Sequence, residues 1–207
     1  MLSACFVDNM NKTTSAAETT GVLTTTTHDP TTSTAATDAT TGTLDCADFK
    51  ATLLVEDATV VAPMKTLMTT AEGTVAYSEK EEEGTVEFRF TAPCAGTYAV
   101  WGRVLDQKPG PGTVDPDSFH ARVDDGPEIT WLYGCTTGAT NTDWSWQPVR
   151  SLSDDDDCEV AAAWPLELTA GEHAITLRNL EDSFTDSHAA VARILVTSDP
   201  DYTPTSE

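Results

Sequence analysis

The sequence predicts an all-β protein: an antiparallel β-sandwich of the jelly-roll type, preceded by a disordered Thr-rich tether. Three observations predict this fold. About ten short runs of residues are rich in β-branched and aromatic side chains or alternate apolar with polar positions. Turn signals containing Gly, Pro or Asp separate these runs, and no window of helical length keeps a 3.6-residue apolar period. The 207 residues leave room for one folded domain of about 150 residues.

The N-terminal residues 1–12 predict a lipid attachment site. Leu2-Ser3-Ala4 precedes Cys5 as in a bacterial lipobox, where an aliphatic residue and two small residues stand before the modified cysteine. Five cysteines leave one without a disulfide partner in an oxidising compartment, and thioether lipidation of Cys5 would account for it. Phe6 follows in place of Asp, which by the lipoprotein sorting rule predicts the outer membrane. No run approaches the roughly 18 apolar residues of a spanning helix, so we expect an exported protein with a covalent lipid anchor.

Residues 13–43 form the predicted tether. Thr dominates this segment, with Ala, Ser, Gly and Asp, and almost nothing in it can be buried. As a flexible chain it would hold a domain roughly 35 Å from its anchor on average. The composition changes at Leu44-Asp45-Cys46, where the predicted sandwich of residues 44–204 begins, and residues 205–207 form a short tail.

Ten segments of the sandwich are predicted strands. Thr85–Phe90 shows the strictest alternation, which places Val86, Phe88 and Phe90 on one face. Trp101 and Trp164 lie within regular strand patterns, so we expect both in the core. The predicted strands are 51–56, 74–77, 85–90, 97–104, 118–123, 129–133, 142–150, 163–168, 173–177 and 191–197.

Four cysteines remain for the domain and allow three pairings, between which the sequence does not decide. We favour Cys135–Cys158, because both flank the segment with Trp144 and Trp146, which leaves Cys46–Cys94. Each disulfide would contribute a few kcal/mol in a domain exposed outside the cytoplasm.

The charge balance argues against nucleic acid as a partner. The chain has 11 basic and 34 acidic residues, a formal charge of −23, which repels phosphate backbones. The acidic runs 81–83 and 154–157 are expected to be solvated loops, since neither has the spacing of a calcium loop.

Enzymatic activity is not expected. The sequence contains no phosphate-binding Gly loop, no Gly-x-Ser-x-Gly and no zinc-binding His pair, and its four histidines are scattered. A pair of carboxylates is not excluded among so many acidic residues, so a glycoside hydrolase stays a third hypothesis.

The aromatic residues are more informative. Trp131, Tyr133, Trp144 and Trp146 lie within sixteen positions, and Trp144 and Trp146 are two apart, so on a strand they point to the same side. An exposed tryptophan offers a flat apolar face to a sugar ring, while Asp or Asn side chains hydrogen-bond its hydroxyls. We take these four aromatics, with Asp117 and Asn179, as candidate glycan-binding residues. The alternative is that the rings fill the core.

A succession of short fragments resembles the family 6 and family 35 carbohydrate-binding modules. In order they are 55–58 (VEDA), 84–88 (GTVEF), 95–104 (AGTYAVWGRV), 117–119 (DSF), 123–126 (VDDG), 144–146 (WSW), 168–173 (LTAGEH) and 194–197 (ILVT). The resemblance covers most of residues 53–203. It implies a galactose-binding-like jelly roll that binds glycans in loops at one end or on a sheet face, often with a structural calcium.

The sequence departs from this family pattern at the calcium ligands. Glu56 is the only remnant of the acidic pair on the first strand, Leu54 replaces the earlier carboxylate, and Ala192 stands where an Asp is expected. We therefore expect no cofactor. The main hypothesis is a surface-displayed lipoprotein that binds a polysaccharide without transforming it, and the alternative is a structural or adhesive lipoprotein that contacts another protein.

Overall fold

A computed structural model of the chain describes residues 46–105, 117–133, 144–151, 162–181 and 188–205. One compact unit spans Gly42–Glu207. Cys5, the 13–43 segment, Cys135 and Cys158 lie outside the described residues. In the part of the chain that the structure describes, no helix is long and apolar enough to span a membrane.

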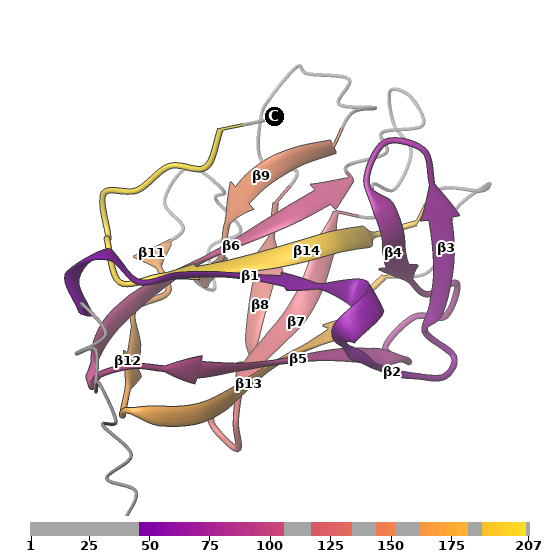
Figure 1. Cartoon of the computed structure of the whole chain (residues 1–207). Helices are drawn as coiled ribbons and strands as arrows, with labels where there is room; N and C mark the ends of the chain where they lie inside the picture. The colour runs from indigo at the N-terminus through magenta and orange to yellow at the C-terminus, as the bar shows by residue number, and fades with distance from the viewer. Residues whose placement is uncertain (1–45, 106–116, 134–143, 152–161, 182–187, 206–207) are drawn as a thin grey trace, which may run out of the picture. The chain divides into compact units, whose positions relative to one another are not determined.

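Two antiparallel sheets pack face to face (Figure 1). The seven-stranded sheet contains β12 (Leu166–Leu168), β6 (Gly96–Leu105), β14 (Ala190–Thr197), β4 (Gly73–Tyr77) and β3 (Lys65–Thr69), with β1 (Lys50–Leu54) also paired to β14 and β9 (Trp144–Pro148) to β6. The five-stranded sheet contains β2 (Thr59–Val61), β5 (Thr85–Ala92), β13 (Gly171–Asn179), β7 (Ser118–Val123) and β8 (Ile129–Leu132). The predicted all-β sandwich is confirmed.

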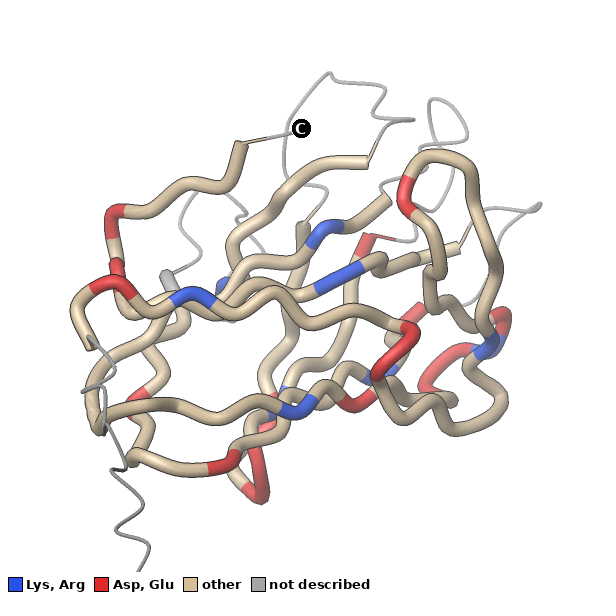
Figure 2. The backbone as a smooth tube through the Cα atoms, viewed as in Figure 1, with Lys and Arg blue, Asp and Glu red and all other residues tan. Residues whose placement is uncertain are grey.

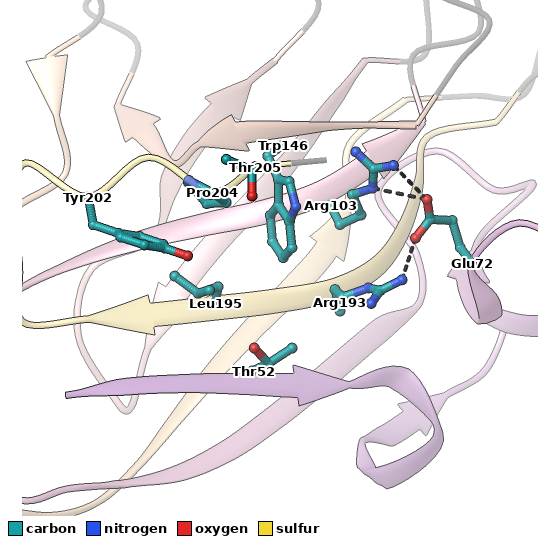
Figure 3. A pocket seen from close by; sticks show the side chains of 9 residues that line it. All are labelled: Thr52, Glu72, Arg103, Trp146, Arg193, Leu195, Tyr202, Pro204 and Thr205. Carbon is teal, nitrogen blue, oxygen red and sulfur yellow. Dashed lines mark hydrogen bonds and ion pairs between the residues drawn. The ribbon is translucent and has the colours of Figure 1, made fainter. Parts of the chain in front are cut away.

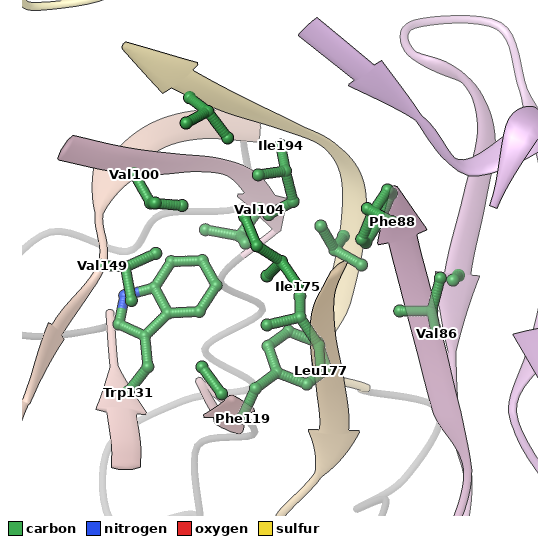
Figure 4. Close-up of a cluster of buried hydrophobic side chains, with 14 of the residues drawn as sticks. Val86, Phe88, Val100, Val104, Phe119, Trp131, Val149, Ile175, Leu177 and Ile194 are labelled. Atoms are coloured by element: carbon green, nitrogen blue, oxygen red, sulfur yellow. The ribbon is translucent and has the colours of Figure 1, made fainter. Parts of the chain in front are cut away.

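The core lies between the sheets, because alternate residues of each strand point inward (Figure 4). On β5 the predicted face is confirmed: Val86, Phe88 and Phe90 are buried. Ile175 and Leu177 of β13 and Ile194 of β14 are fully buried against them.

Some strands differ from their predicted extent. The first ends at Leu54 in a 3-10 turn (Val55–Asp57). The segment 163–168 is interrupted at Pro165, which lacks the N–H that a ladder needs; the preceding β11 (Ala162–Ala163) pairs with β10 (Arg150–Ser151) in a separate two-stranded sheet. Strands β2 and β3 are additional. Their residues are mostly exposed, so they carry little apolar alternation.

The prediction for Trp101 is wrong. The inward positions of β6 are Tyr98, Val100 and Val104, so Trp101 points to the outer face of the seven-stranded sheet, where it is half-buried. The inward position beside it is Gly102, and a Cβ atom there would lie 2.2 Å from Cη2 of the Trp131 ring. Only glycine lets β6 pass over this ring.

The predicted Cys46–Cys94 disulfide is confirmed, with 5.9 Å between its Cα atoms. Cys46 begins the 3-10 turn Cys46–Asp48 before β1, and Cys94 lies in the turn between β5 and β6. The bond therefore ties the entry of the chain into the sandwich to that turn. The predicted Cys135–Cys158 pair lies outside the described residues.

Candidate functional site

Two of the candidate aromatic residues belong to the core. Trp131 is 0% exposed and packs on Phe119 and Tyr133, and its Nε1–H donates to the carbonyl of Pro148 at 3.0 Å. Tyr133 is 3% exposed. These two rings cannot stack on a ligand, so their assignment to a glycan-binding face is corrected. Trp131 of β8 and Tyr133, which follows that strand, share its inward side, and closeness in the sequence does not reveal which side faces the core.

The candidate polar residues Asp117 and Asn179 are also buried. Asn179 donates from Nδ2 to the carbonyls of Lys80 and Glu181, at 2.7 and 2.5 Å, and so joins the segment before β5 to the end of β13. The backbone carbonyl of Asp117 accepts from the N–H of Tyr133 at 2.9 Å. Both contacts are structural, and neither residue reaches the face that bears Trp144 and Trp146.

Trp144 and Trp146 lie on β9 at the outer face of the seven-stranded sheet. Trp144 pairs with Leu105 of β6, and Trp146 pairs with Arg103. Both tryptophans are half-buried, and each borders a hollow in the sheet surface. The structure therefore brings together two of the six candidate glycan-binding residues.

The hollow beside Trp146, which we call the arginine hollow, has a volume of about 260 Å³ (Figure 3). Thr52 and Leu195 form its floor on β1 and β14, and Tyr202 of the C-terminal segment stands opposite Trp146. Arg103, Arg193 and Glu72 close the remaining side.

An ion triad dominates the electrostatics of the arginine hollow. Arg103 of β6 and Arg193 of β14 are direct cross-strand partners. Glu72, from the turn between β3 and β4, accepts from Nε and Nη2 of Arg103 at 3.0 and 2.8 Å and from Nη2 of Arg193. Burial raises the pKa of the Glu72 carboxyl, but the hydrogen bonds from the two guanidinium groups outweigh it and lower the pKa, so Glu72 stays ionised.

The second hollow, beside Trp144, is apolar and has a volume of about 300 Å³. Leu105 and Ala190 are among its lining residues, as are Tyr77 and His188, whose rings stack with centroids 4.9 Å apart. Because Trp144 and Trp146 are two positions apart on one strand, the two hollows lie next to each other along β9. An elongated ligand that lay along β9 could therefore contact both tryptophan rings.

A third hollow, of about 440 Å³, lies between the β7–β8 turn and the β12–β13 turn, beside Trp164. Asp124 accepts from Nδ1 of His173 at 2.7 Å, and the carbonyl of Thr169 accepts from Nε2 at 2.9 Å. Since both ring nitrogens face acceptors, this arrangement favours the charged form of His173. Burial lowers the pKa of His173, but these hydrogen bonds outweigh it and raise the pKa. This arrangement ties two turns together and leaves the ring no free nitrogen for a ligand.

Among the described residues, no group of three or more His, Cys, Asp or Glu side chains could hold a metal ion. Glu56, the remnant of the family's calcium site, is exposed in the 3-10 turn after β1. The expectation that the chain carries no cofactor, calcium included, stays a prediction.

Comparison with known proteins finds the fold and no close relative. No protein-family model matches this chain, and no curated protein matches its sequence. A family 35 carbohydrate-binding module from Clostridium thermocellum is 16% identical over 72% of this chain and 98% of its own, with a TM-score of 0.51. The C-terminal family 6 module of the marine laminarinase LamC from Zobellia galactanivorans is 13% identical over 72% of this chain and 100% of its own, with a TM-score of 0.48. The sandwich thus has a carbohydrate-binding-module-like fold, as its fragments predicted.

Sequence reasoning missed four residues of the arginine hollow: Glu72, Arg103, Arg193 and Tyr202. Arg103 stands in a strand among apolar residues, where a buried-core interpretation overlooks it. Basic residues are scarce, 11 in the whole chain, but five of them lie in predicted strands: Arg89, Arg103, Arg122, Arg150 and Arg193. Their scarcity therefore does not by itself single out the pair at this site.

Proposed function

We propose that this protein binds a polysaccharide on the outer face of the seven-stranded sheet and does not transform it. The observation that carries the proposal is the placement of Trp144 and Trp146, half-buried on one side of β9 with a hollow beside each. A sugar offers a single large apolar surface, the C–H face of its ring, and a fixed aromatic side chain is its usual partner.

The chemistry of the hollows supports binding without catalysis. Glycoside hydrolysis uses two carboxyl groups, one of them protonated. Glu72 is the one carboxylate that lines either hollow among the described residues, and its pKa is lowered by two arginines, so it does not supply the acid.

In this proposal the protein acts outside a bacterial cell. The Cys46–Cys94 disulfide supports export to an oxidising compartment. We further propose that Cys5 carries the lipid anchor in the outer membrane and that residues 13–43 space the sandwich from it. Labelling with a palmitate analogue, in cells that express the protein from its own gene, tests this: equal labelling of wild type and Cys5→Ala would refute the anchor.

One observation favours the alternative, an adhesive role. Strand β3 lies at an edge of the seven-stranded sheet. Two of its apolar residues are largely exposed, Leu67 by 54% and Met68 by 71% of their possible surface. Exposed apolar edge strands invite pairing with another chain. A partner captured through β3 would be lost on Met68→Lys, whereas glycan binding at Trp146 would not change.

A glycan array probed with the full chain tests the main proposal. We expect retention by a defined class of glycan and loss of that signal in Trp146→Ala. An array without any retained glycan would refute the proposal and favour the adhesive role.

A further inference from the structure

The cross-strand pair of Arg103 and Arg193 is a costly arrangement. Like charges directly opposite each other on one face of an antiparallel sheet repel, and here the register places the two arginines opposite each other on β6 and β14. The charge of −23 repels a polyanion at long range, so an anionic group could be held only where some of the 11 basic residues are concentrated. Figure 2 shows how few basic positions the described backbone carries, with acidic positions in several of the surrounding turns and loops.

Glu72 relieves only part of this repulsion. It supplies one negative charge to two guanidinium groups, which leaves the arginine hollow with a net positive charge. Within the described residues, Nη1 of Arg103 and Nε of Arg193 are buried and have no hydrogen-bond partner. A buried charged donor without a partner carries a large desolvation penalty.

The two arginines of the triad both line the arginine hollow. Figure 3 shows one nitrogen of the Arg103 guanidinium without a dashed line, on the side away from Glu72, and the Trp146 ring of the neighbouring strand β9 beside Arg103. Arg193 is the more accessible of the two, with 31% of its side chain exposed against 11% for Arg103. If the ion pairs only fixed the β3–β4 turn to the sheet, a single arginine opposite Glu72 would be enough. The second arginine leaves the triad with one positive charge more than its single carboxylate can balance.

We propose that Arg103 and Arg193 bind the anionic substituent, a carboxylate or a sulfate, of an acidic polysaccharide whose sugar ring stacks on Trp146. This inference rests on the proposed function, which it deepens by naming the ligand class. Guanidinium groups suit both oxyanions, since their forked N–H donors match two oxygens at once. Glu72 holds the two arginines in place, and the ligand oxyanion satisfies the charge that Glu72 leaves.

Two matched pairs of polymers test the proposal with the full chain in affinity electrophoresis at 0.15 M salt. Polygalacturonate and its methyl ester differ only in the carboxylate, and dextran sulfate and dextran differ only in the sulfate. We expect one charged polymer to bind at least about tenfold more tightly than its neutral partner, the scale of a charge-assisted hydrogen bond. The pair that shows this preference identifies the oxyanion.

Two variants separate the arginine site from a general charge effect. Arg193→Gln removes the accessible arginine and should abolish the preference. Arg89→Gln removes an exposed arginine, 71% exposed on β5 of the other sheet, and should leave it unchanged. If the neutral polymers bind equally well and binding still requires Trp146, the proposed function stands and this inference is wrong. If none of the four polymers is bound, the inference is wrong, and the glycan array decides the proposed function separately.

Glu72→Gln supplies a second measurement that does not depend on an intact polymer site. It leaves two arginines without their anion, so we expect its melting temperature to rise more than that of wild type when sodium galacturonate or a sulfated monosaccharide is added, with galactose as control. A purely structural triad predicts no such difference between Glu72→Gln and wild type, and that result would overturn the proposal.

Discussion

Gly102→Ala tests the packing that supports the proposed binding face. The added Cβ would lie 2.2 Å from Cη2 of Trp131 and 3.1 Å from both Cζ2 and Cζ3. The ring has no room to retreat, because it is fully buried, contacts Phe119 and Tyr133, and donates to the carbonyl of Pro148. Overpacking of a fixed core costs about 1–3 kcal/mol, and a clash this close on a bonded ring belongs at the upper end, about 3 kcal/mol.

Thermal and urea unfolding measure this cost. For a domain of this size about 3 kcal/mol corresponds to a melting temperature lower by about 6–12 °C. Gly96→Ala, on the same strand, is the matched control, since nothing lies within 4 Å of its added Cβ. In a Trp131→Leu background the further cost of Gly102→Ala should fall below about 1 kcal/mol. A stability of Gly102→Ala within about 0.5 kcal/mol of wild type would refute the packing of Trp131 beneath β6.

Three further predictions concern interactions outside the binding face. The difference in stability between wild type and His173→Gln should be largest between about pH 3.8 and 6.5. It should shrink as the pH rises through the raised pKa of His173, and as the pH falls through the lowered pKa of Asp124; a pH-independent difference in denaturant unfolding would contradict this. Opening the Cys46–Cys94 disulfide, with its separation of 48 residues, should cost about 4 kcal/mol, measured with Cys46→Ser/Cys94→Ser. Thiol titration of the denatured, unreduced and unlipidated chain should find Cys5 alone; three thiols would refute Cys135–Cys158.

The alternation of side chains predicted most of the fold. Val86, Phe88 and Phe90 are inward because a strand of that pattern has one apolar face. Trp101 was misplaced because the sequence around it, with Ala99, Val100 and Gly102, is apolar on both faces of β6, and the face then depends on register with β14.

The site was predictable only in part. Trp144 and Trp146 share a face wherever a strand runs through them, so their pairing needed no tertiary information. The triad depends on three separate elements, since Glu72 comes from the β3–β4 turn, Arg103 from β6 and Arg193 from β14. Cross-strand register and the path of an unpredicted hairpin bring them together, and neither follows from periodicity.

The central claim is that the outer face of the seven-stranded sheet binds a glycan through Trp146. Calorimetric titration of the full chain with the best-retained array glycan, repeated for Trp146→Ala and accompanied by thermal unfolding, tests it directly. Loss of a stacking aromatic costs roughly 2 kcal/mol or more, so affinity should fall about thirtyfold while the melting temperature stays within a few degrees of wild type. Unchanged affinity in Trp146→Ala, or unfolding without selective loss of binding, would contradict the account.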